Sequence, residues 1–72
     1  MKYQRIEDMR IDHDLTQKQI ALEIGCNREV YRRYEAGVRE IPVWVLIALA
    51  KYYNCSTDYL LGISDNKRRF GK

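Results

Sequence analysis

The chain has 72 residues, of which 46% are hydrophobic and 32% charged, and its formal net charge is +3. This length suits one small domain, and no apolar run approaches the roughly 20 residues that a membrane-spanning helix needs. The mild positive charge is compatible with a polyanionic partner, but it also fits many unrelated proteins.

The N-terminal stretch has the pattern of a first helix. Residues 1–5 contain no apolar secretion core, so we expect a cytoplasmic protein. Ile6 and Met9 form the apolar stripe of this helix, and Leu15 lies at its exit. Asp14 suits this exit, because aspartate tolerates the left-handed conformation.

The stretch from Leu15 to Gly37 predicts two short amphipathic helices joined by a tight glycine turn. Thr16 and Gln19 have the spacing of a capping box, which satisfies backbone N–H groups at the start of the first of these helices. Gly25 suits the left-handed conformation that ends it, and Asn27 suits the N-cap of the second.

Each helix of this pair has one apolar face. Ala21 shares a face with Ile20 and Ile24, and its small side chain lets the second helix cross close to the first. On the second helix we interpret Tyr31 as a core residue with its hydroxyl at the edge of the core. The charged residues of this helix fill most of its remaining surface: Arg28, Glu29, Arg32 and Arg33.

Two further helices are predicted beyond this pair. Pro42 suits the first turn of the fourth helix. We expect its buried face to consist of apolar residues at helical spacing, namely Val43, Val45, Leu46, Leu49, Ala50 and Tyr53. Ser56 then suits the N-cap of a short fifth helix that ends at Gly62.

The order and spacing of these residues resemble the Cro and phage-repressor type of helix-turn-helix domain, often called Xre-like. The similarity covers roughly residues 6–62 and includes Leu15-Thr16-Gln17, Ile20-Ala21, Ile24-Gly25, Tyr34-Glu35-Ala36-Gly37, Ile41-Pro42 and the run 46–62. It implies an all-α fold, a compact lambda-repressor-like bundle of about five short helices. We expect residues 1–63 to form this domain and residues 64–72 to form a polar, basic and flexible tail.

The resemblance also implies that double-stranded DNA is the partner and that the helix Arg28–Glu35 enters its major groove. The candidate base-reading residues are Arg28, Glu29, Val30, Arg32 and Arg33. The candidate phosphate ligands are Thr16, Gln17, Lys18, Asn27 and Arg39. We expect Arg28 to contact a guanine, because arginine can donate two hydrogen bonds to guanine O6 and N7.

Two carboxylates need a separate interpretation. Glu29 can accept a hydrogen bond from cytosine N4, or it can pair with Arg33 one turn later and hold that side chain in place. Arg10 and Glu35 match positions that form an ion pair in relatives. The resemblance implies that this pair ties the first helix to the end of the DNA-reading helix.

Apolar residues also occupy positions that are usually charged in relatives, namely Ile11, Leu22, Trp44 and Ala48. Trp44 and Ala48 are one turn apart on the outward side of the fourth helix. Because family members commonly dimerise through the fourth and fifth helices, we expect a homodimer with Trp44 in its interface. The alternative is that Phe70 or Tyr3 covers Trp44 within one chain.

Nothing in the sequence indicates a metal site, a cofactor or catalysis. Cys26, Cys55 and His13 lack the spacing of metal ligands, and we expect both cysteines to be reduced thiols. There is no nucleophile elbow or glycine-rich phosphate loop, so we do not expect an enzyme.

These observations predict a sequence-specific transcriptional regulator, a repressor that binds an inverted-repeat operator as a dimer. Two alternatives stay open. One is an antitoxin in which the apolar surface masks a toxin. The other is a protein-interaction module built on the same fold.

Overall fold

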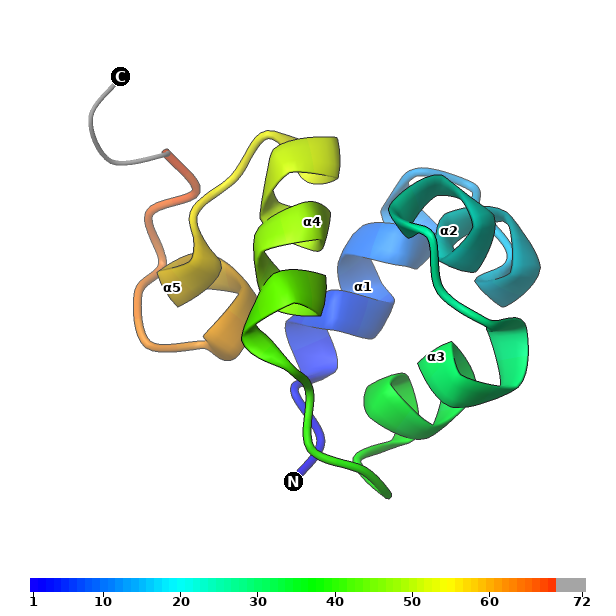
Figure 1. Cartoon of the computed structure of the whole chain (residues 1–72). Helices are drawn as coiled ribbons and strands as arrows, with labels where there is room; N and C mark the ends of the chain where they lie inside the picture. Colours follow the sequence, from blue (N-terminus) through cyan, green and yellow to red (C-terminus); the bar gives the residue numbers. More distant parts are fainter. Residues whose placement is uncertain (69–72) are drawn as a thin grey trace.

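The structure, a computed structural model, describes residues 1–68 and contains the helices α1 (Gln4–Asp12), α2 (Gln17–Ile24), α3 (Arg28–Ala36), α4 (Val43–Tyr53) and α5 (Thr57–Leu61). Figure 1 shows α2 and α3 at one end of the molecule and α5 at the other, with α1 and α4 between them. The part of the chain that the structure describes has no β-strand. The predicted all-helical fold is therefore confirmed.

Side-chain caps and a glycine set the boundary between α2 and α3. The Thr16 hydroxyl accepts from the backbone N–H of Gln19, and the Gln19 side chain accepts in return from the backbone N–H of Thr16. Gly25 ends α2 with a φ of 75°. The Asn27 side chain accepts from the first N–H groups of α3. These contacts confirm the predicted capping box, glycine turn and N-cap.

All five helices or their flanking residues contribute to the core. Its buried hydrophobic members are Ile6, Met9, Ile20, Ala21, Tyr31, Tyr34, Val45, Leu49, Ala50, Tyr53, Cys55 and Leu60. Full burial of an Ile or Leu side chain stabilises the fold by about 1.5–3 kcal/mol. Ala21 is buried on α2, and α2 packs directly against α3.

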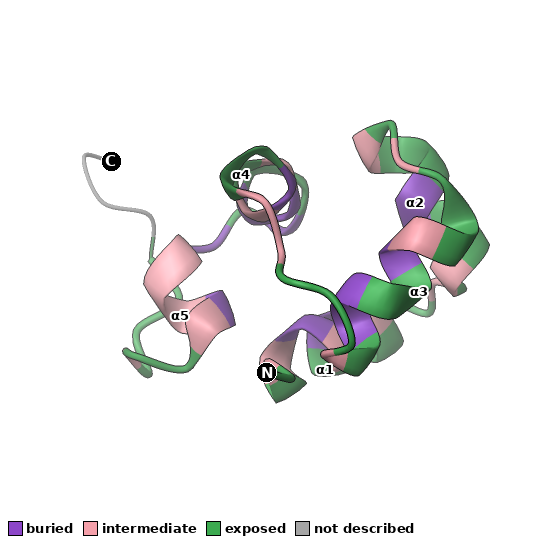
Figure 2. Cartoon of the chain, turned by 60° about the horizontal axis from the view of Figure 1, so that its bottom comes forward, coloured by how far each residue is buried: buried purple, intermediate pink, exposed green. Residues whose placement is uncertain are grey.

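The start of α4 differs from the prediction. Val43 was expected in the core, but it is 71% exposed, and Pro42 is the N-cap rather than the first helical residue. Helix residues are about 100° apart, so Val43 lies about 200° around the axis from Val45, which is fully buried. Figure 2 shows buried and exposed segments on different sides of α4.

A search of the described helices finds no candidate membrane-spanning segment.

The segment that follows α5 lies against α5 and α1. The backbone N–H of Ser56 donates to the carbonyl of Lys67, at 2.9 Å. Arg5 donates to the carbonyl of Ser64 and forms an ion pair with Asp65. Residues 69–72, the rest of the predicted tail, lie outside the described residues, and so does Phe70, which was considered as a cover for Trp44.

Candidate nucleic-acid interface

The outer edge of α3 is charged and exposed, whereas its inner face is buried. The buried members are Tyr31, Tyr34 and Glu35. The exposed charged members are Arg28, Glu29, Arg32 and Arg33. Figure 2 shows this division along the helix. Because the inner face packs into the core, the helix holds its charged edge in a defined position toward solvent.

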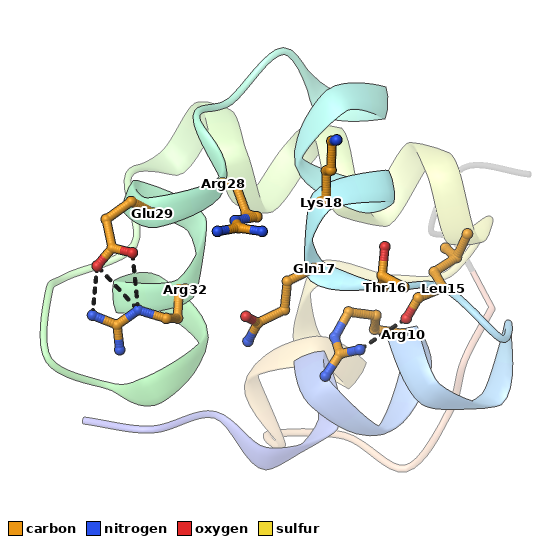
Figure 3. Close-up of a pocket in the computed structure, with 8 residues that line it drawn as sticks. All are labelled: Arg10, Leu15, Thr16, Gln17, Lys18, Arg28, Glu29 and Arg32. Carbon is orange, nitrogen blue, oxygen red and sulfur yellow. Dashed lines mark hydrogen bonds and ion pairs between the residues drawn. The ribbon is translucent and has the colours of Figure 1, made fainter.

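An open cleft of about 500 Å³ lies beside this edge (Figure 3). It is lined by Arg10, Leu15, Thr16, Gln17, Lys18, Arg28, Glu29 and Arg32. The cleft therefore brings together the end of α1 and the first turns of α2 and α3. Helix N-termini carry partial positive charge, so the backbone adds to the cationic side chains here, and the cleft favours an anion.

Glu35 is the buried hub beneath this cleft. Its carboxylate is 2% exposed and accepts from Arg10 Nε and Nη2 at 2.9 and 3.1 Å. It also accepts from the Tyr31 hydroxyl at 2.8 Å and from Gln17 Nε2 at 3.1 Å. Arg10 donates in addition to the carbonyl of Leu15 at 2.8 Å. One carboxylate thus links α1, α2 and α3.

Two features of this hub were not predicted from the sequence. The Tyr31 hydroxyl was expected at the edge of the core, but it is buried because Glu35 accepts its hydrogen bond there. The spacing of four residues between Tyr31 and Glu35 on one helix could have indicated this contact. The hydrogen bond from Gln17 to Glu35 joins α2 to α3, and no spacing of nearby residues in the sequence predicts it.

Glu29 forms a surface ion pair on α3. Arg32 Nη2 lies 2.6 Å from Glu29 Oε1, and Arg33 Nε lies 3.8 Å from the same oxygen. The predicted pair with Arg33 is therefore present but loose, and the closer contact is with Arg32. The hydrogen bonds from Arg32 lower the pKa of the Glu29 carboxyl.

Arg28 and Lys18 differ from the other cations of the cleft. Neither side chain forms a hydrogen bond or an ion pair with another residue of the range 1–68. In Figure 3 Arg28 and Gln17 point into the space between α2 and α3. The guanidinium N–H groups of Arg28 are thus available to a ligand in the cleft.

The remaining predicted site residues lie outside the lining of the cleft. Val30 is half-buried and packs against the core, and Arg33 is exposed further along α3. Asn27 uses its side-chain oxygen as the N-cap of α3. Arg39 is exposed in the loop after α3, with its guanidinium 5.9 Å from the centre of the Tyr34 ring.

Comparison with known proteins places this geometry in a family. A family model described as "Helix-turn-helix" matches residues 6–60. The chain is 39% identical over 66 residues to the "Uncharacterized HTH-type transcriptional regulator YobD" of Bacillus subtilis, covering 92% of this chain and 59% of that protein. It is 31% identical over 61 residues to the "Cryptic phage CTXphi transcriptional repressor RstR" of Vibrio cholerae, covering 85% and 55%.

A third relative is the "HTH-type transcriptional regulator ImmR" of Bacillus subtilis, 34% identical over 58 residues that cover 81% of this chain and 46% of that protein. The chain thus spans between 46% and 59% of the length of these three relatives. The match over residues 6–60 includes α2, α3 and the turn between them. The chain belongs to the helix-turn-helix family of the Cro and phage-repressor type.

Proposed function

We propose that this chain is a DNA-binding transcriptional regulator that inserts α3 into the major groove. The observation that carries the proposal is the exposed edge of α3, which holds three arginines on a helix whose opposite face is buried. The relatives that are named transcriptional regulators or repressors support it. The cleft beside α3 supplies an anion site that suits a DNA phosphate.

Within this proposal, α3 reads bases and the residues around it bind phosphates. Arg28 reads a guanine, because both of its fork nitrogens are available for O6 and N7. Val30, Arg32 and Arg33 complete the base-reading set further along the helix. Phosphates are bound by the start of α2 and by residues that flank α3, namely Thr16, Gln17, Lys18, Asn27 and Arg39. These phosphate contacts set the position of α3 without reading sequence.

Selection of bound fragments from a random duplex pool, followed by titration of single variants, tests these tasks. Arg28→Ala should weaken binding by about 1–3 kcal/mol and relax the preference at one base position. Arg39→Ala should weaken binding to all sequences alike and make the salt dependence shallower. A uniform loss of affinity in both variants would contradict the division between base and phosphate contacts.

We further propose that the regulator is a repressor that binds an inverted repeat as a homodimer. The support is an apolar strip on α4, where Val43, Trp44 and Ile47 are 71%, 52% and 43% exposed and Ala48 is partly exposed beside them. Exposed apolar groups that are contiguous mark interaction surfaces. The half-sites should lie about one helical turn apart, roughly 34 Å.

Sedimentation analysis of Trp44→Glu tests the dimer. A charge in the strip should convert the parent dimer to a monomer, because the charge would have to lose its hydration in the interface. Leu22→Glu is the matched control, since Leu22 is 79% exposed on α2 and lies outside the strip. A monomeric parent, or an unchanged dimer in Trp44→Glu, would show that the strip is not the dimer surface.

A further inference from the structure

The charged residues on the outer edge of α3 are not equivalent. Arg32 Nε lies 3.1 and 3.2 Å from the two oxygens of Glu29, and its Nη2 lies 2.6 Å from Oε1. Arg33 Nε approaches the same carboxylate more loosely, at 3.8 Å. One glutamate therefore engages two of the three arginines, and Arg28 is left as the arginine without a partner on α3 within the described chain.

The geometry of this contact limits what Arg32 can offer to DNA. With Nε and Nη2 on Glu29, only Nη1 makes no contact within residues 1–68. A paired Arg32 thus cannot present the Nε and Nη2 edge to a guanine, whereas Arg28 can. The side chains of Glu29 and Arg32 are each about half exposed, at 51% and 48%, so duplex DNA can reach the pair.

The Glu29–Arg32 pair is weaker than a specific contact between Arg32 and a base. An exposed pair one turn apart on a helix shifts an equilibrium by only about two-fold. A well-placed bidentate contact to a base changes discrimination by roughly 5-fold to more than 100-fold. On the correct base sequence, a contact between Arg32 and a base can therefore more than offset the loss of the pair. On an incorrect sequence, breaking the pair brings little in return.

From these contacts we infer that Glu29 is a specificity-determining positioning residue, which acts through Arg32 and not by reading a base itself. Its carboxylate holds Arg32 on the helix surface and repels nearby phosphates, so it weakens binding to non-cognate DNA more than binding to the operator. This inference rests on the proposed DNA-binding function.

Binding titrations test this role of Glu29. The parent chain and Glu29→Gln are each titrated against the selected operator and against a random duplex, over a range of salt concentrations. The variant should bind the random duplex about 3- to 10-fold more tightly near 0.1 M salt, with a log–log salt slope steeper by about one. Its affinity for the operator should change by less than about two-fold. The ratio between the two affinities should therefore fall.

Glu23→Gln is the matched control for net charge. Glu23 is exposed on α2 and makes no hydrogen bond or ion pair with other residues of the range 1–68, and its substitution removes the same negative charge. It should leave the affinity ratio unchanged. Equal shifts in Glu23→Gln and Glu29→Gln would contradict the inference, because net charge alone would then explain the effect. Thermal melting shows whether each variant is folded.

A double-mutant cycle tests the route through Arg32. In an Arg32→Gln background, Glu29→Gln should lose most of its effect on the affinity ratio. If Glu29→Gln instead lowers operator affinity and changes one base preference in both backgrounds, Glu29 reads a base and the inference is wrong. A parent chain that binds both duplexes alike contradicts the proposed function and the inference together. A discriminating parent with an unchanged ratio in Glu29→Gln contradicts the inference alone.

Discussion

At the scale of single residues, Gly25 and Gly37 have the same backbone conformation in different surroundings. Each follows a helix of the α2–α3 pair, with φ of 75° and 80°. A Cβ added at Gly25 would have no heavy atom within 4 Å, other than its chain neighbours. A Cβ added at Gly37 would lie 2.6 Å from the backbone nitrogen of Lys2 and 2.8 Å from its Cα. The end of α3 thus depends on close approach of the N-terminal segment.

This difference predicts unequal losses of stability. Gly25→Ala should lower the free energy of unfolding by about 1–2 kcal/mol, the ordinary cost of a left-handed alanine. Gly37→Ala should lower it further, because the backbone at Lys2 must also move. Urea denaturation of both variants measures the two losses. Equal losses would show that the contact between Gly37 and Lys2 does not restrict the fold.

At the scale of elements, the three helices that build the cleft are joined by one buried carboxylate. Glu35 on α3 accepts from Arg10 on α1 and from Gln17 on α2. Burial removes the hydration of both charges, so their attraction is largely offset by the cost of desolvation. The pair therefore sets the orientation of the helices more than it raises the total stability.

A comparison of one single and one double variant tests this balance. Arg10→Met leaves the Glu35 carboxylate buried without its counter-charge and should lower the free energy of unfolding by about 3–5 kcal/mol. Arg10→Met combined with Glu35→Gln should lose less, because a neutral amide leaves no buried charge unpaired. The amide oxygen can still accept from Gln17, and the amide NH2 group can donate to the Tyr31 hydroxyl oxygen. Urea denaturation gives both values. A double variant that is less stable than Arg10→Met would contradict the prediction.

At the scale of the whole molecule, two buried tyrosines set an alkaline limit to stability. Burial, followed by the hydrogen bond to Glu35, raises the pKa of Tyr31 far above its usual range. Burial also raises the pKa of Tyr53, with a further contribution from the charge of Glu35. The Tyr53 hydroxyl has no hydrogen-bond partner among the described residues. Unfolding is therefore linked to the release of tyrosine protons at high pH.

The sign of this linkage gives a prediction. Unfolded tyrosines titrate near pH 10, whereas Tyr31 and Tyr53 keep their protons in the folded chain beyond that pH. Stability should be unaffected by this linkage below about pH 9 and should fall as the pH rises through about 10. Thermal melting across this range measures the fall. Tyr53→Phe should make it shallower, because it removes one of the two buried hydroxyls.

The sequence by itself determined the boundary between α2 and α3 and the charged edge of α3. Thr16, Asn27 and Gly25 act on backbone groups within a few residues, so spacing along the chain is sufficient to predict their contacts. The exposed position of Arg28 follows in the same way from helical periodicity, because the apolar face of its helix must be buried.

Only the folded structure decided that Gln17 bonds to Glu35 and that Arg32, rather than Arg33, is the closer partner of Glu29. Gln17 and Glu35 meet because α2 packs across α3, and a contact 18 residues apart has no signature in local spacing. Arg32 and Arg33 both lie within one turn of Glu29, so the fork geometry of Arg32 decides between contacts of similar energy. Local rules determine helices and their ends, whereas contacts between side chains of comparable strength depend on where the folded chain places their atoms.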